Sequence, residues 1–124
     1  MISSWIKIFS EVPPIKAKSE EIQQIFINLL TNAVQAMEGK GELRISTIGE
    51  NGNVRAIIRD TGPGIPKEYL SKIYDPFFTT KEQGRGTGLG LNIVHQLVVK
   101  YGGKIDVSSQ EGEGTTFSLT FPAS

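Results

Sequence analysis

Residues 22–37 read Ile-Gln-Gln-Ile-Phe-Ile-Asn-Leu-Leu-Thr-Asn-Ala-Val-Gln-Ala-Met, and this stretch decides the fold. Its apolar residues recur every three or four positions, which is the spacing of one face of an α-helix. Ser19 stands where an N-cap is expected, and Glu20 and Glu21 place negative charge where it complements the helix dipole. Gly39 follows at the position where such a helix should end. The sequence therefore predicts one long amphipathic helix.

Short segments on both sides of this helix alternate apolar with polar residues and predict β-strands. These segments are residues 5–9, 43–48, 54–59, 104–109 and 115–121. The last four are expected to form two hairpins, because the residues between their members, 49–53 and 110–114, are polar and rich in glycine.

A helical spacing returns in residues 89–101, and Gly102-Gly103 follows where that helix should stop. A short helical turn is expected at residues 67–72. The order strand, helix, hairpin, helix, hairpin predicts an α+β fold. We expect a two-layer α/β sandwich, in which a mixed but mainly antiparallel sheet carries helices on one face. Because no repeat or domain boundary is visible, residues 1–124 are predicted to form a single domain.

The composition of the 124 residues suits a globular core, with 38% hydrophobic and 21% charged residues. Thirteen basic residues balance thirteen acidic ones, which argues against a protein that binds nucleic acid or an anionic membrane surface. Cysteine is absent and His95 is the one histidine, so a zinc site is not expected. We interpret His95 as a surface residue. No apolar run is long enough to cross a bilayer.

A cluster of glycines leads into the helix predicted at residues 89–101. Residues 84–90 read Gly-Arg-Gly-Thr-Gly-Leu-Gly, which exposes backbone N–H groups beside a helix N-terminus, an arrangement that suits phosphate. Lys81 and Arg85 add positive charge nearby. The spacing fits neither a Walker loop nor a Rossmann fingerprint. Since tight turns also explain clustered glycine, the pattern alone leaves both interpretations open.

Asn28 and Asn32 lie four residues apart on the first predicted helix, so their carboxamides share one face. Ordinary polar residues at the edge of a helix are one interpretation. The other is a pair of neutral oxygen ligands for Mg²⁺, which is held by few protein oxygens together with phosphate oxygens and water. The residues alone leave this choice open.

Asp60 ends an apolar strand and enters the sequence Thr-Gly-Pro-Gly. It is either a turn residue at the end of a strand or a hydrogen-bond acceptor for an exocyclic amine such as that of adenine. A carboxylate only accepts hydrogen bonds, so it prefers an amino to a keto group and would select adenine over guanine. Gly62 and Gly64 would let the backbone approach the edge of the ring.

Together these residues resemble the ATP-binding domain shared by histidine kinases, gyrase-type topoisomerases, Hsp90 chaperones and MutL proteins. The likeness covers nearly the whole chain and rests on five motifs that occur in the order of the family. They are the N box at residues 24–33, the first glycine box at 60–65, the F box of histidine kinases at 75–81, the second glycine box at 86–91 and the final glycine box at 112–117.

The resemblance implies a role for each matching position. Asn32 would coordinate Mg²⁺, with Asn28 assisting at the metal or its waters. Asp60 would bind the adenine amino group, and Thr116 would share a water beside it. The other implied nucleotide contacts are the backbone at Gly62 and Gly64, the ring neighbours Ile65, Ile73 and Leu89, and the phosphate-binding backbone of Gly86, Thr87, Gly88, Leu89 and Gly90. Residues 75–88 would form a mobile lid over the nucleotide.

Position 28 separates the branches of the family. The members that hydrolyse ATP carry a glutamate there, which activates water, whereas Asn28 cannot act as a general base. The resemblance therefore implies a protein-histidine kinase catalytic domain that holds ATP or ADP with Mg²⁺ and presents the γ-phosphate to an outside nucleophile. Many histidine kinases also carry a lysine where this chain has Gln35, so Lys81 or Arg85 is expected to supply the missing charge as a catalytic cation.

The acceptor histidine is expected on a separate helical-hairpin dimerisation domain of the same kinase, because the sequence shows no such hairpin. A response regulator receiver domain is the implied next partner, and no nucleic-acid partner is expected. We expect this piece to be monomeric and cytoplasmic, within a full-length protein that can be membrane-anchored. Two alternatives stay open: a stand-alone serine kinase of the anti-sigma type, and a non-enzymatic sensor of adenine nucleotides.

Overall fold

A computed structural model describes residues 4–9, 17–38, 40–75 and 90–123. The elements in chain order are β1 (Ser4–Phe9), α1 (Ser19–Ala36), β2 (Glu42–Glu50), β3 (Asn53–Asp60), the 3₁₀ turn η1 (Lys67–Tyr69), α2 (Gly90–Lys100), β4 (Lys104–Gln110) and β5 (Gly114–Pro122). The expected short helix at residues 67–72 is thus a single 3₁₀ turn.

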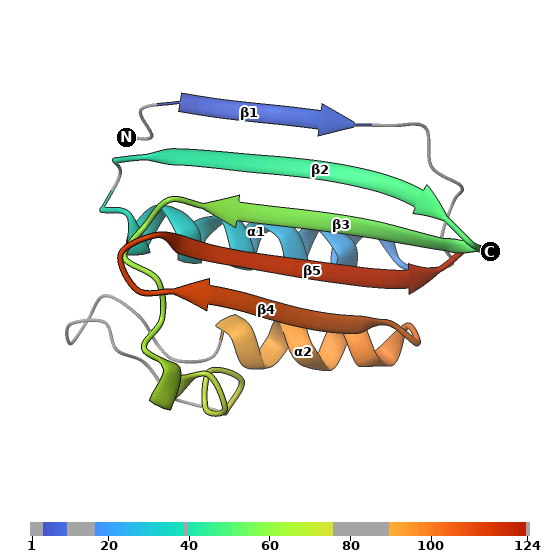
Figure 1. The fold of residues 1–124 in the computed structure, drawn as a ribbon. Coiled ribbons are helices and arrows are strands. Elements are labelled where there is room, and N and C mark those ends of the chain that lie inside the picture. The colour runs from blue at the N-terminus through green and yellow to red at the C-terminus, as the bar shows by residue number, and fades with distance from the viewer. Residues whose placement is uncertain (1–3, 10–16, 39, 76–89, 124) are drawn as a thin grey trace.

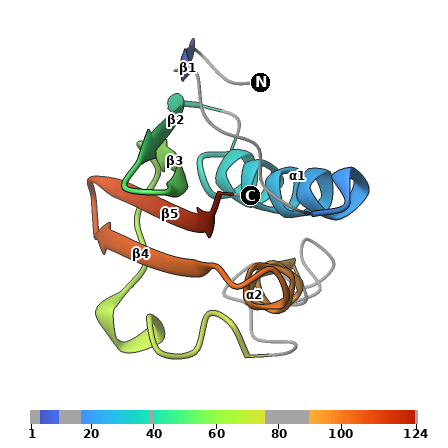
Figure 2. The ribbon, with the colours of Figure 1, turned by 90° about the vertical axis from the view of Figure 1, so that its right-hand side faces the viewer.

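One five-stranded sheet forms the first layer, in the order β1-β2-β3-β5-β4. β1 pairs with β2 in parallel, and the other neighbours are antiparallel. Both helices lie on the same face of the sheet, behind the strands in Figure 1 and to one side of them in Figure 2. The predicted two-layer α+β sandwich with a mixed, mainly antiparallel sheet is confirmed.

The core lies between the sheet and the two helices. Because side chains alternate along a strand, every second residue of β2, β3 and β5 faces the helices. The buried apolar residues there include Leu43, Ile45, Ala56, Ile58, Phe117, Leu119 and Phe121. The helices contribute Ile25, Leu29 and Ala33 from α1 and Val94 and Val98 from α2, at the spacing of one helix face.

The β2–β3 turn is tighter than the sequence predicts. The strands continue to Glu50 and resume at Asn53, so only Asn51 and Gly52 connect them. Both of these residues have positive φ, 51° and 77°, as a two-residue primed turn requires. The expected loop at residues 49–53 was therefore too long, because the sheet extends its ladder into the polar residues.

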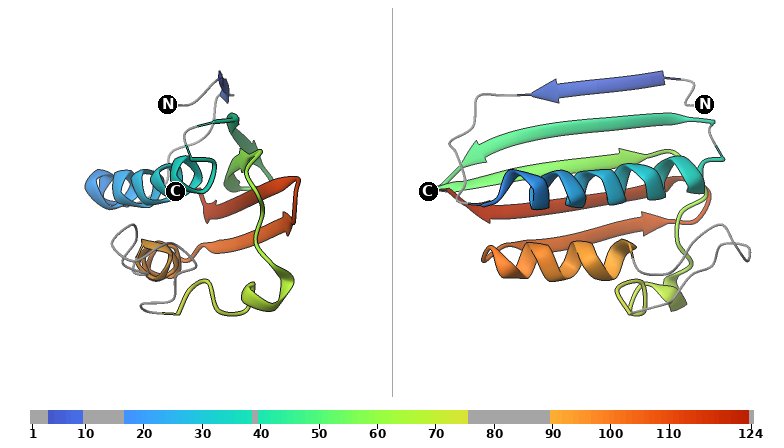
Figure 3. Two further views of the ribbon diagram at one scale, coloured as in Figure 1. Left: turned by 90° about the vertical axis from the view of Figure 1, so that its left-hand side faces the viewer. Right: turned by 180° about the vertical axis from the view of Figure 1, so that it is seen from behind.

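The two helices run in opposite directions, as the right-hand view in Figure 3 shows, so the end of α2 lies beside the start of α1. The end of α2 is as predicted: Gly102 has a φ of 75°, its N–H donates to the Val99 carbonyl, and that of Gly103 donates to the Val98 carbonyl. These two bonds make a Schellman motif.

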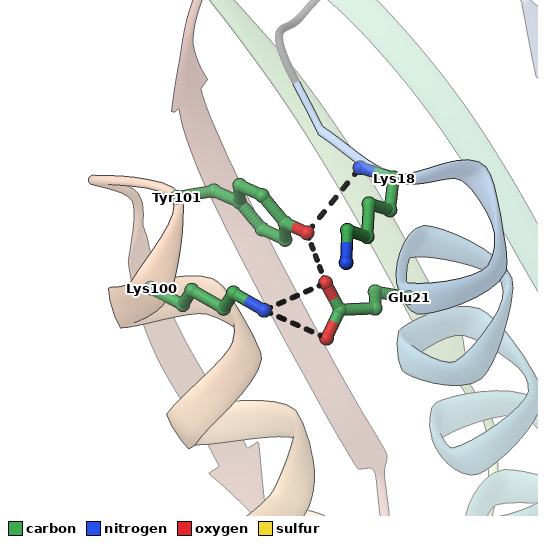
Figure 4. A network of polar contacts seen from close by, with 4 residues as sticks. All are labelled: Lys18, Glu21, Lys100 and Tyr101. Atoms are coloured by element: carbon green, nitrogen blue, oxygen red, sulfur yellow. Dashed lines mark hydrogen bonds and ion pairs between the residues drawn. The ribbon is translucent and has the colours of Figure 1, made fainter.

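The start of α1 differs from the prediction that Ser19 is its N-cap. Ser19 is already helical, and Lys18 occupies the cap position without a side-chain cap bond. Instead, the Lys18 backbone N–H donates to the Tyr101 hydroxyl over 3.3 Å, and that hydroxyl donates to Glu21 (Figure 4). Lys100 Nζ also donates to both Glu21 oxygens, at 2.9 and 3.0 Å. A tertiary contact therefore replaces the local cap and joins the two helices.

Leu29 gives a direct test of this packing. It is 1% exposed between α1 and the sheet, so Leu29→Ala should lower the free energy of unfolding by about 2–5 kcal/mol in urea titrations. Ile27 on the same helix is 56% exposed, and Ile27→Ala should cost only about 0.5 kcal/mol. Equal losses for the two variants would contradict the observed orientation of α1.

Candidate functional site

Asp60 is the last residue of β3, and only 5% of it is exposed. The Gly62 backbone N–H donates to its Oδ1 over 2.8 Å. Burial raises the pKa of the Asp60 carboxyl above its ordinary value, and hydrogen bonds from the Gly62 and Thr115 backbones oppose that rise. A buried carboxylate is costly unless its oxygens find donors, so this end of β3 favours a ligand that donates a hydrogen bond.

Glycines let the backbone close around this carboxylate. A Cβ added at Gly62 would lie 3.0 Å from Asp60 Oδ1, and one at Gly114 would lie 2.0 Å from the Asp60 carbonyl oxygen. Gly64 has a φ of 78°, and a Cβ there would lie 2.4 Å from the Gln110 carbonyl oxygen. Any side chain at Gly64 or Gly114 would displace the backbone next to Asp60, and one at Gly62 would press on the Asp60 and Met37 side chains.

The loop that follows Asp60 is held against the β4–β5 hairpin. The Ile65 backbone N–H donates to Ser109 Oγ over 2.7 Å, and the Gly112 N–H donates to the Pro63 carbonyl over 2.8 Å. Ile65 is partly buried and packs against the core. The position of the loop is therefore set by residues almost fifty positions further along the chain.

A row of side chains crosses the sheet at the level of Asp60. The register pairs Leu43 with Asp60, Asp60 with Thr115, and Thr115 with Ser109, so all four side chains share the helix-facing side. Thr115 is 6% exposed, and its Oγ1 lies 3.0 Å from Ser109 Oγ. Thr116 is paired with Arg59 on the opposite side of the sheet. The threonine beside Asp60 is thus Thr115.

α1 connects this row to the start of α2. Asn28 Nδ2 donates to the Gly90 carbonyl over 3.4 Å, and Asn28 Oδ1 accepts from Gln24 Nε2 over 2.8 Å. Asn32, one turn further on, is partly buried. At the end of the helix, buried Met37 lies against the Gly62 loop, about 13 Å beyond Asn28 at the helical rise. Along α1, the contact with the start of α2 therefore comes first, Asn32 follows one turn later, and the contact with the loop after Asp60 comes last.

The segment after the loop returns to α2. Ile73 is 5% exposed in the core, and the Tyr74 carbonyl accepts from Asn92 Nδ2 over 2.9 Å. Burial raises the pKa of Tyr74 to about 12, so its hydroxyl stays protonated, and its ring lies 5.1 Å from that of His95. His95 is exposed, as predicted.

Several predicted site residues fall in a segment that the structure leaves out. Lys81, Arg85, Gly86, Thr87, Gly88 and Leu89 lie outside the described residues, as does the predicted lid apart from Asp75. Within the described residues, no three or more histidine, cysteine, aspartate or glutamate side chains gather as metal ligands. In the same part of the chain, no helix has the length and apolar character needed to span a membrane.

The sequence model of the histidine kinase-, DNA gyrase B- and HSP90-like ATPases matches residues 17–124. The chain belongs to this family. Its structure is similar to the solved catalytic domain of histidine kinase ThkA, with a TM-score of 0.83 and 35% identity over 98% of this chain and 78% of that one. This chain is also similar to part of full-length ShkA, which was solved in complex with AMPPNP. The TM-score is 0.84 and the identity 31%, over 99% of this chain and 26% of that one.

The curated relatives are kinases that are much longer than this chain. Sensor histidine kinase ZraS of Escherichia coli is 40% identical over 111 residues, which cover 90% of this chain and 23% of ZraS. Sporulation kinase E of Bacillus subtilis is 35% identical, over 98% of this chain and 16% of that protein. The chain therefore spans about a quarter or less of these relatives.

The structure gathers part of the predicted site and adds two residues. Asp60, Gly62, Gly64 and Ile65 surround one end of β3, and Asn28 meets Gly90 at the start of α2. Thr116 faces away from Asp60, and the sequence analysis overlooked Thr115 and Ser109. The alternation along the last strand shows that Thr115 and Thr116 face opposite sides, but only the register with β3 shows which of them lies beside Asp60.

Asp60→Asn tests whether this end of β3 binds the base of a nucleotide. Asparagine can still accept the Gly62 N–H but lacks the charge, so ADP affinity should fall about 10- to 100-fold in calorimetry. Asp106→Asn, a change of the same kind on the exposed edge strand β4, is the matched control and should bind normally. Unchanged affinity in Asp60→Asn would contradict the role of the carboxylate.

The same variant has a stability signature. Because burial raises the pKa of Asp60, the folded state holds more protons than the unfolded state, and stability falls as pH rises through that raised pKa. At pH 7, Asp60→Asn should therefore melt at a temperature no lower than the wild type does. A large loss of stability would mean that weaker ADP binding reflects partial unfolding.

Proposed function

We propose that this catalytic domain binds Mg-ATP and presents the γ-phosphate to a histidine on a separate helical-hairpin domain, as in autophosphorylation of a two-component sensor kinase. The observation that carries the proposal is the arrangement along α1. The end of that helix lies against the loop that follows the buried acceptor Asp60, and Asn28, midway along the helix, contacts the start of α2. Asn32 lies on the helical turn between these two points.

The end of β3 at Asp60 favours adenine as the bound base. The carboxylate of Asp60 accepts from the exocyclic amino group, whereas a keto oxygen at the same place would set two acceptors against each other. The backbone at Gly62 and Gly64 leaves room at the edge of the ring. Ile65, Ile73 and Leu89 are the proposed apolar neighbours of the ring.

The other end fits the phosphates and the metal. Neutral amide oxygens and the absence of a carboxylate cluster among the described residues suit an ion that is held mainly by phosphate oxygens and water. We assign Asn32 as the protein ligand, and Mg²⁺ bound there would neutralise phosphate charge. The backbone of Gly86 to Gly90 at the start of α2 would donate to the phosphates, with Lys81 and Arg85 as additional cations.

Asn28 argues for transfer rather than hydrolysis. It has no carboxylate to activate water, and its amide is already engaged, with Oδ1 accepting from Gln24 and Nδ2 donating to Gly90. In this arrangement Asn28 fixes the start of α2 against α1. Any part it takes at the metal would pass through a water, and catalysis would rest on positioning and charge neutralisation.

The proposed partners follow from the reaction. The acceptor histidine would lie on a dimerisation domain of the same kinase, and the receiver domain of a response regulator would take the phosphoryl group next. Balanced charge offers no attraction for nucleic acid. We propose a cytoplasmic, monomeric domain within a longer kinase that can be membrane-anchored, with residues 75–88 as the lid.

A chimaera tests the proposal. In it, this chain replaces the matching 111-residue region of Escherichia coli ZraS, and the product is incubated with γ-labelled ATP and Mg²⁺. We expect acid-labile, base-stable label on the protein, as a phosphohistidine requires, with little free phosphate released. Asn32→Ala in the same chimaera should abolish labelling and remove the Mg²⁺ dependence of nucleotide binding.

The alternatives give different results in this assay. Acid-stable label would indicate a serine kinase. A chimaera that binds ADP but takes up no label would support a nucleotide sensor. Rapid steady-state release of free phosphate would contradict the reading of Asn28. ADP binding by the chimaera, measured first, shows that its nucleotide site is folded.

A further inference from the structure

The Ser109 hydroxyl has three polar neighbours. It accepts the Ile65 backbone N–H over 2.7 Å, lies 3.1 Å from the Gly114 carbonyl oxygen, and lies 3.0 Å from Thr115 Oγ1. Ser109 thereby touches the loop after Asp60, the first residue of β5 and the threonine paired with Asp60. It does not reach the base site itself, so any effect on the ligand must pass through these neighbours.

The number of protons fixes the direction of these bonds. A serine hydroxyl donates one hydrogen bond and accepts two. The Ile65 N–H uses one acceptor position, and the Gly114 carbonyl can only accept, so it must take the proton of Ser109. The remaining contact is satisfied only when the Thr115 hydroxyl donates to Ser109. All three contacts are then made, and the capacity of the serine is fully used.

Because the Thr115 hydroxyl donates to Ser109, it can only accept hydrogen bonds on the side that faces Asp60. Its single proton points toward Ser109, so only lone pairs remain for the side of the row where Asp60 lies. Threonine and carboxylate then form two adjacent acceptors, matched by a ligand edge or a bridging water that donates. We propose that Ser109 is a positioning residue that sets base specificity, because it orients the Thr115 hydroxyl and holds the loop at Ile65. This inference rests on the proposed nucleotide-binding function.

Loss of the Ser109 hydroxyl frees the proton of Thr115. The freed proton can turn to the Asp60 carboxylate or to a keto oxygen of a bound base. The first outcome takes an acceptor away from adenine, and the second gives guanine a donor. Both reduce the preference for adenine, whereas a purely structural role of Ser109 would lower stability and leave the preference unchanged.

The test compares ADP and GDP binding by calorimetry in the wild type and in Ser109→Ala. Ser108→Ala is the matched control, since Ser108 is the preceding residue of β4, is exposed and faces the other side of the sheet. We expect ADP affinity to fall about tenfold in Ser109→Ala, as for the loss of one well-placed hydrogen bond, and the ratio of the GDP to the ADP dissociation constant to fall with it. Ser108→Ala should change neither quantity.

A second pair of variants separates the hydroxyl from the shape of the side chain. Ser109→Thr and Ser109→Val differ only in a hydroxyl against a methyl group, and threonine should restore the preference for ADP while valine should not. A wild-type ratio in both Ser109→Ala and Ser109→Val would overturn the inference. Failure of the wild type to bind ADP at all would instead overturn the proposed function, and this inference with it.

Discussion

The carboxylate of Asp60 lies buried at the end of β3, and the residues around it are arranged to keep it hydrogen-bonded. The Gly62 N–H donates to it, and three glycines let loop and strand backbones come close. Burial nevertheless raises the pKa of Asp60, because the charged carboxylate costs more free energy to bury than the neutral acid. Such a cost at a site is the usual sign that function, rather than stability, maintains it.

Polar contacts join the two helices at two levels along α1. At the start of α1, Glu21 binds Lys100, the last residue of α2, and Tyr101, which follows it. Midway along α1, Asn28 Nδ2 donates to the Gly90 carbonyl at the start of α2 over 3.4 Å. An exposed ion pair contributes little stability on its own. The buried apolar faces therefore stabilise the helix layer, and the contacts of Glu21 fix how the two helices lie relative to each other. The nucleotide site that we propose lies beside the start of α2, away from the cluster at Glu21.

The fold could be predicted from the sequence because its signals are local. Helical spacing in residues 22–37 and alternation in the strands identify the elements, and Gly102 stops α2 by its own conformation. The N-cap prediction at Ser19 was wrong because a hydroxyl far along the chain, on Tyr101, takes the Lys18 N–H. Thr115 and Ser109 were overlooked for the same reason: strand register, which single-sequence patterns do not determine, brings them to Asp60. The roles of Asn32, Asp60 and the glycine-rich segment remain predictions.

The central claim is that Asp60 reads the amino group of adenine. A crystal structure of this chain with ADP and Mg²⁺ tests it most directly. The account predicts the exocyclic amino nitrogen of adenine about 2.7–3.2 Å from an Asp60 carboxylate oxygen, with the diphosphate beside the start of α2. An adenine ring bound elsewhere, or turned so that its amino group faces away from Asp60, would contradict it.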